Sequence, residues 1–219
     1  MDHKLLDYLQ SFLTERRREL FDRVLSERTH HVTVAVEDVY QLHNTSAVIR
    51  SCESFGVQEL HVIEEINAKR IDREIAMGAQ KWVDVHRHMS TKDCLKTLKD
   101  KGYRIVATTP HQKAHRLEDF DITEKAAIFF GRETEGLSDA VIEAADDFIY
   151  IPMVGFTESL NISVSAAITL QHIMTKLKAS TIPWQLSDTE VFEKKMEWTK
   201  KMIKDVDRII TRWEKDSQK

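Results

Sequence analysis

The stretch FIYIPMVGFTESLNISVSAAITLQHIMTKL, residues 148–177, predicts a strand, a polar link and a helix in direct succession. The apolar run Phe148–Met153 is typical of a buried strand, and Val154–Glu158 forms the link. Small polar residues then stand where the predicted helix begins, so that their oxygens can cap unpaired backbone N–H groups or hold a ligand. They are Ser159, Asn161 and Ser163.

The same stretch predicts which face of the helix is buried. Apolar residues recur with the period of a helix at Val164, Ala167, Ile168 and Ile173, and we expect them to face the core. Ligand sites of α/β proteins form where a strand leads into a helix. A binding site is therefore one interpretation of this segment, and an ordinary capped helix start is the other.

Five further strand-like runs precede this stretch, and helical segments alternate with them. The strands are expected at 31–39, 59–64, 82–88, 103–109 and 126–130, the helices at 44–56, 72–77 and 91–101, and a polar loop at 110–122. Such alternation predicts an α/β fold with a mostly parallel sheet and helices on both faces. Asn44 is the expected N-cap of the first of these helices.

Amphipathic segments flank the α/β region at both ends. Residues 4–28 and 188–214 each have apolar residues three and four apart, which predicts one long helix in each segment. The C-terminal stripe needs an apolar partner, either the N-terminal helix or another subunit. We expect an N-terminal helical extension at 1–29, a central domain at 30–179 and a C-terminal helical extension at 180–219.

Composition narrows the class of protein. The chain has 219 residues, 42% of them hydrophobic, which is enough to bury a sizeable core. It lacks an apolar run of the roughly 18–20 residues that span a bilayer, and its first residues are charged, so we expect a cytoplasmic protein without a membrane partner. Cys52 and Cys94 are expected to be reduced thiols. The net charge of −4 disfavours indiscriminate polyanion binding but leaves room for a local basic face.

A glycine-flanked loop, GRETEGL, follows the strand that ends at Phe130. Gly131 and Gly136 have the spacing of a phosphate-binding loop, but Leu137 stands where that loop requires lysine, which excludes a nucleotide triphosphatase of that type. No G-x-G-x-x-G follows the first strand, so a dinucleotide-binding domain is also disfavoured. The remaining interpretations are a turn that approaches a ligand closely and a plain left-handed turn.

Three segments together resemble the motifs of the SpoU branch of the SPOUT methyltransferases. They are NTSAVIR (44–50), FGRETEGL (130–137) and IPMVGFTESLNISVS (151–165), and they occur in the family's order. The resemblance implies a deep C-terminal trefoil knot and a homodimer formed through the knot region. With the flanking helices, the chain is most similar to the members that methylate the 2′-oxygen of guanosine 18 in the D-loop of tRNA.

The resemblance also implies a cofactor, S-adenosyl-L-methionine, and no metal. By their positions in the motifs, four residues are expected to bind the cofactor: Thr108, Gly131, Ile151 and Leu160. The catalytic residue is expected to be Arg50, with Asn44, Glu133, Ser159 and Asn161 shaping the site. Because a guanidinium with a pKa above about 12 stays protonated, we expect Arg50 to stabilise charge rather than to accept a proton.

The expected macromolecular partner is tRNA, and neither DNA nor a membrane is expected to bind. Candidate RNA contacts are His43, Arg16, Arg17, Arg18 and Lys176. The lysines near Lys176 stand where the tRNA enzymes carry arginines, which puts the RNA substrate in question. A ribosomal RNA 2′-O-methyltransferase and a non-catalytic RNA-binding module are the alternatives.

The histidines give no metal site by spacing alone. His86 and His88 are two apart and His111 and His115 are four apart, but no third ligand is evident near either pair. We therefore expect these histidines to be surface or core residues.

Overall fold

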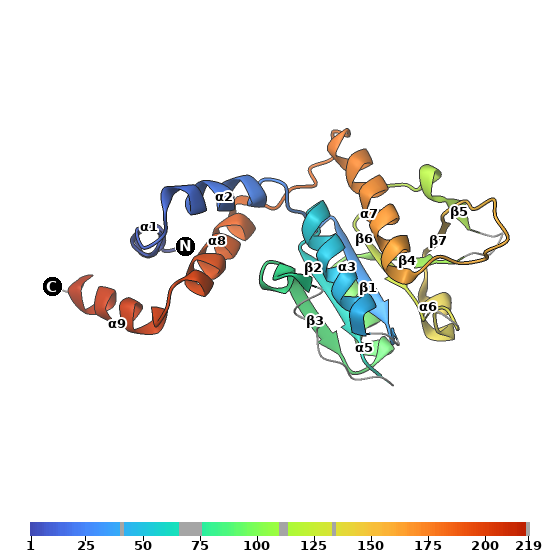
Figure 1. Ribbon diagram of the computed structural model, residues 1–219, viewed down its shortest axis with the longest axis horizontal. Helices are drawn as coiled ribbons and strands as arrows, with labels where there is room; N and C mark the ends of the chain where they lie inside the picture. Colours follow the sequence, from blue (N-terminus) through green and yellow to red (C-terminus); the bar gives the residue numbers. More distant parts are fainter. Residues whose placement is uncertain (40–41, 66–75, 110–113, 133–134, 218–219) are drawn as a thin grey trace. The chain divides into compact units, whose positions relative to one another are not determined.

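The computed structural model describes residues 1–39, 42–65, 76–109, 114–132 and 135–217 (Figure 1). Among them, no helix is both long and apolar enough to cross a membrane. Residues 72–75 of the helix predicted at 72–77 lie outside the described ranges.

A seven-stranded sheet forms the centre of the fold, in the order β3-β2-β1-β6-β4-β7-β5. All of its recorded strand pairs are parallel, which confirms the predicted fold class. The strands are β1 (Val32–Glu37), β2 (Glu59–Ile63), β3 (Asp84–His88), β4 (Arg104–Thr108), β5 (His115–Arg116), β6 (Ala126–Phe130) and β7 (Asp147–Tyr150). The short β5 and the 3-10 turn η2 (Leu117–Asp119) lie within the segment predicted as a loop.

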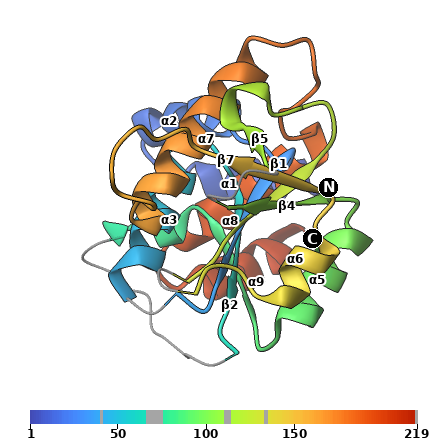
Figure 2. The ribbon, with the colours of Figure 1, turned by 90° about the vertical axis from the view of Figure 1, so that its right-hand side faces the viewer.

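Helices cover both faces of the sheet, as predicted (Figure 2). On one face lie α3 (Leu42–Phe55) and α7 (Ile162–Lys178), and on the other α5 (Thr91–Asp100) and α6 (Asp139–Ala144). Side chains of a strand point to alternate faces. In β1, Val34 and Val36 pack into the core under α3 and α7, whereas Ala35 packs into the core under α5 and α6. Each face of the sheet therefore has its own hydrophobic core.

The buried face of α7 differs from the prediction. Ile173 is buried and Ala167 half-buried, but Val164 and Ile168 are 44% and 39% exposed. The buried row is instead Ile162, Ala166, Thr169, Leu170, Ile173, Met174 and Leu177. A polar residue, Thr169, occupies a core position of this helix, while apolar residues occupy the neighbouring face. Hydrophobicity alone therefore predicted the wrong buried face of α7.

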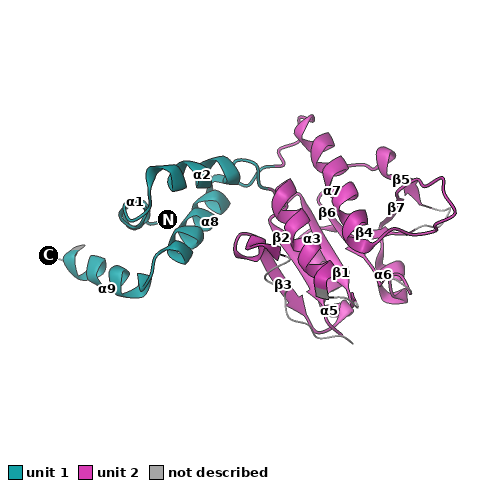
Figure 3. Ribbon diagram, in the orientation of Figure 1, with its two compact units in different colours: residues 1–28, 185–219 teal, residues 29–184 magenta. Residues whose placement is uncertain are grey.

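The described residues form two compact units, residues 29–184 and residues 1–28 with 185–219 (Figure 3). The smaller unit contains α1 (His3–Gln10), α2 (Glu15–Leu25), α8 (Asp188–Met202) and α9 (Val206–Ser217). Of the two partners expected for the C-terminal stripe, the structure shows the N-terminal helices, because the ring of Phe192 lies 4.7 Å from that of His3 and the ring of Trp213 lies 6.4 Å from that of Tyr8. The predicted domain boundaries at 29 and 179 stay a prediction.

Each of the two long terminal helices predicted from the sequence is broken in the structure. The Thr14 hydroxyl accepts a hydrogen bond from the backbone N–H of Arg17 at 3.3 Å, so a new helix begins after Thr14. Asp205 has a left-handed φ of 53° between α8 and α9. Periodicity missed both breaks because the apolar spacing continues across them.

Candidate functional site

A cavity of about 530 Å³ lies at the carboxyl ends of β4, β6 and β7. Its walls come from Thr108 and Thr109 after β4, from the loop after β6, and from the link between β7 and α7. Parallel strands all end at one edge of a sheet, so loops far apart in sequence meet there. The volume is in the range typical of small-molecule sites, roughly 300–1,000 Å³.

The loop after β6 folds back on itself at the cavity wall. The N–H of Arg132 donates to the carbonyl oxygen of Gly136 at 2.9 Å. The N–H of Gly136 donates in return to the carbonyl oxygen of Arg132 at 3.0 Å. A Cβ added to Gly131 would lie 2.3 Å from the carbonyl carbon of Gly136 and 2.4 Å from the nitrogen of Leu137. No side chain fits at 131, because the backbone of Gly136 and Leu137 occupies that space, and Gly136 itself has a left-handed φ of 71°.

The cavity is mostly apolar and contains few charges. Much of its lining is hydrophobic, namely Leu117, Phe130, Leu137, Ile142, Ile149, Ile151, Met153, Leu160 and Ile162. The guanidinium of Arg132 is ion-paired with Glu135 across the turn. Within the described part of the chain, the buried Nε of Arg132 has no hydrogen-bond partner. The walls therefore suit an organic ligand with a few polar groups.

The start of α7 is joined to α3 beside the cavity. Asn161 caps α7, as its Oδ1 accepts from the N–H and hydroxyl of Ser163 at 2.8 and 2.6 Å. Its Nδ2 donates to Oδ1 of Asn44 at 3.2 Å. The prediction of Asn44 as an N-cap is wrong, because α3 already begins at Leu42 and Asn44 is 1% exposed inside the helix. The buried Asn44 side chain instead accepts the hydrogen bond from Asn161 at the start of α7.

The structure brings together most of the residues predicted for the site. Five of them line the cavity: Thr108, Gly131, Ile151, Ser159 and Leu160. Asn161 and Asn44 are bonded beside it. Arg50 lies on α3 about 9 Å along the axis from Asn44, is exposed, and is not among the described lining residues. Glu133 lies outside the described residues.

The candidate RNA contacts lie in different parts of the fold. Arg16, Arg17 and Arg18 lie on α2, where Arg16 and Arg18 are exposed and Arg17 is half-buried. His43 is exposed in the first turn of α3. The ammonium of Lys176 donates to the Phe120 and Glu118 carbonyls at 2.6 and 3.3 Å, which favours a structural role for this lysine.

Sequence reasoning missed several lining residues. They are Thr109, Tyr150, Met153, Glu158, Ser165 and Thr169. Thr109 and Met153 end predicted strands, so the rule that ligands bind at the carboxyl edge of a sheet indicated them. Thr169 lies inside a helix, where no local signal marks a lining residue. Within the described residues, the group able to hold a metal ion, His61, His88 and Cys94, lies outside this cavity.

Comparison with known proteins gives consistent matches. The model of the SpoU rRNA Methylase family matches residues 31–171. A tRNA (guanosine(18)-2'-O)-methyltransferase of Borreliella burgdorferi is 36% identical over 201 residues, which cover 92% of each chain. The Thermus thermophilus protein of the same name is 34% identical and covers 86% of this chain and 98% of its own.

Solved structures agree with these matches. The A. aeolicus TrmH/SpoU tRNA modifying enzyme superposes with a TM-score of 0.77 and 31% identity, covering 87% of this chain and 98% of that one. AviRb from Streptomyces viridochromogenes, a SpoU methyltransferase solved in complex with AdoMet, has a TM-score of 0.63 at 24% identity over 73% of this chain and 65% of that one. The second match supports the fold alone.

The bond pattern at Asn161 generates a stability prediction. Asn161→Ala removes both the α7 cap and the bond to Asn44, so the free energy of unfolding in urea should fall by about 0.5–2 kcal/mol. Asn161→Asp keeps the capping oxygen and loses the amide donor, so its loss should be smaller. Equal losses in the two variants would contradict this division of roles.

Proposed function

The chain belongs to the SpoU family of RNA methylases, and we propose that it methylates the ribose 2′-oxygen of guanosine 18 in the D-loop of tRNA. The enzyme class follows from the family, whose model matches residues 31–171. The tRNA substrate is supported by relatives from two bacteria that carry this activity in their names and align along most of their length. Such a substrate also supports the predicted cytoplasmic location.

The cavity fits S-adenosyl-L-methionine, which supplies the methyl carbon. Its volume of about 530 Å³ matches a ligand of that size. At Gly131, a lining residue, the absent Cβ lets the backbone of Gly136 and Leu137 pack closely and form this wall of the cavity. The sulfonium needs neutral surroundings, and the Arg132 charge in the wall is already paired with Glu135. The close approach of the backbone at Gly131, in the wall of this cavity, is the observation that carries the proposal.

Arg50 is the proposed catalytic residue. A ribose hydroxyl is a poor nucleophile, and its oxygen gains negative charge as it attacks the methyl carbon. The guanidinium of Arg50 stabilises that charge and the adjacent phosphate, while the proton leaves through the phosphate or a water. The exposure of Arg50 on α3 suits a residue that meets a large RNA. Asn44, Ser159, Asn161 and Glu133 are proposed to shape the site around it.

A homodimer through the start of α7 is the proposed assembly. Val154 and Phe156 on the preceding link are 105% and 108% exposed, and Val164 and Ile168 on α7 are 44% and 39% exposed. Apolar side chains gathered in one segment favour burial against a partner. A second copy presents the same segment, so a symmetric contact buries both. The trefoil knot implied by the resemblance stays part of this proposal.

Ribose-methylation mapping tests the function and the role of Arg50 together. Mass spectrometry of tRNA from cells lacking the gene should show loss of 2′-O-methylguanosine 18, and the wild-type gene should restore it. Arg50→Ala should not restore it, with purified turnover at least about 100-fold lower and cofactor affinity by calorimetry unchanged.

Three outcomes would contradict parts of this proposal. Loss of ribose methylation from ribosomal RNA alone would support the alternative substrate. Absence of cofactor binding in calorimetry would favour a non-catalytic RNA-binding module. Full turnover by Arg50→Ala would remove the proposed mechanism while leaving the substrate intact.

Glycine substitutions test the cofactor pocket. Gly131→Ala places a methyl group against the backbone of Gly136, so we expect calorimetry to show at least a tenfold weaker affinity for S-adenosylmethionine. Gly155→Ala is the matched control, because its nearest neighbour would be 3.9 Å away, and it should bind normally. Equal affinities for Gly131→Ala and the wild type would place the cofactor elsewhere.

A charge on α7 tests the dimer. Ile168→Glu puts a carboxylate into the proposed contact, where burial of an unpaired charge is costly, so light scattering should report a monomer. Ile168→Val keeps the apolar surface and should remain dimeric. A wild-type monomer, or a dimeric Ile168→Glu protein, would refute this interface.

A further inference from the structure

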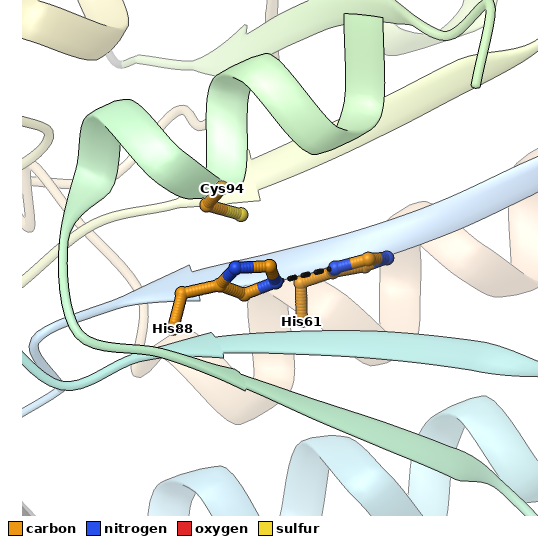
Figure 4. Close-up of side chains that lie close together, drawn as sticks. All are labelled: His61, His88 and Cys94. Atoms are coloured by element: carbon orange, nitrogen blue, oxygen red, sulfur yellow. Dashed lines mark hydrogen bonds between the residues drawn. The ribbon is translucent and has the colours of Figure 1, made fainter. Parts of the chain in front are cut away.

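A cluster of histidines and one cysteine lies on the sheet face that α5 covers, away from the cavity. His61 lies in β2, His88 ends β3 and Cys94 lies in α5 (Figure 4). The Nδ1 of His61 and the Nε2 of His88 are 2.9 Å apart and hydrogen-bonded. One ligand atom from each of the three residues falls within 4.8 Å of the others. The structure therefore places two further possible ligands near His88, neither of which its spacing from His86 in the sequence indicates.

We propose that His61, His88 and Cys94 bind a divalent transition-metal ion, and that this ion is Zn²⁺. Two imidazoles and one thiolate are a ligand set that zinc accepts, with a water or other ligand in the fourth position. Ligand atoms around tetrahedral zinc are about 3.3–3.6 Å apart, given metal–ligand distances of about 2.0–2.3 Å. The observed separations, 2.9 Å between the two nitrogens and at most 4.8 Å within the group, lie on either side of this range.

The hydrogen bond between the two rings has the form that a metal ion can replace. Each of the two nitrogens directs a lone pair or a proton at the other across 2.9 Å. A metal ion takes the position of the shared proton and binds both nitrogens as neutral imidazoles. Figure 4 shows Cys94 pointing from α5 toward the two rings, so its sulfur is the third ligand.

An outer shell is already arranged around His61. Its Nε2 has no hydrogen bond within the described chain, and Oε2 of Glu59 lies 3.6 Å from it. Lys101 holds the other Glu59 oxygen at 2.9 Å. A carboxylate on the far nitrogen of a ligating histidine fixes the ring's tautomer and strengthens it as a ligand. This arrangement directs the Nδ1 lone pair of His61 toward the proposed metal.

Protonation and access are compatible with metal binding. Burial lowers the pKa of His61 and of His88, so both rings are neutral at physiological pH. Burial raises the pKa of the Cys94 thiol to about 12, so the metal must displace its proton, as it does at other thiolate sites. Access comes from the edge of the sheet, where β3 is the outer strand and His88 is only half-buried.

Cobalt substitution tests the site on the full-length, untagged and reduced protein. One equivalent of Co²⁺ should give the visible absorption of tetrahedral cobalt together with a thiolate charge-transfer band in the near ultraviolet. Zn²⁺ should displace the cobalt at one ion per chain, measured by elemental analysis. Zinc should also raise the melting temperature, because it binds the folded state.

Matched variants assign the ligands. His88→Ala and Cys94→Ser should each lose at least about 90% of the bound metal while circular dichroism shows an unchanged fold. The controls are His86→Ala, which removes a ring stacked on His61, and Cys52→Ser, which alters the buried thiol of the opposite core. Both controls should keep one equivalent of metal and the charge-transfer band.

The outcomes separate clearly. Failure of the wild type to take up cobalt or zinc at one per chain would overturn the proposal, as would copper binding without zinc binding. Metal retention by both His88→Ala and Cys94→Ser would also overturn it. None of these results depends on whether the enzyme methylates tRNA.

Discussion

The candidate site depends on one close backbone approach. At Gly131 the chain leaves β6 and passes so near to Gly136 and Leu137 that a side chain is excluded. Residues at the carboxyl ends of β4, β6 and β7 line one cavity, because the parallel pairing of these strands places those ends at the same edge of the sheet. The cavity therefore depends on the close approach at Gly131 and on the parallel pairing of the strands.

The alternation of strands and helices was predictable because each element carries its own periodicity. The six longer strands, the capping role of Asn161 and five lining residues of the cavity were all found from the sequence. The phase of α7 was not, because Thr169 is a polar residue in the core. The cluster that we propose to bind a metal was also missed, because His61, His88 and Cys94 become neighbours only through strand pairing and the packing of α5. Local patterns contain no information about such contacts.

The position of Arg50 links the proposed catalysis to the proposed assembly. Its side chain is exposed on α3, whereas the cavity lies beyond the bond between Asn44 and Asn161. A residue on the outside of one helix acts on an RNA ribose only when that RNA is held against the same surface. Substrate docking, and a second subunit beside α7, would therefore complete a site that a single chain leaves open.

The smaller unit also constrains the order in which the chain matures. Its helices come from both ends of the polypeptide, and Phe21 of α2 packs on Trp198 of α8. During synthesis from the N-terminus, the apolar faces of α1 and α2 leave the ribosome long before their C-terminal partners. This unit can close only after α8 and α9 have been synthesised, and until then the apolar faces of α1 and α2 lack the helices on which they pack.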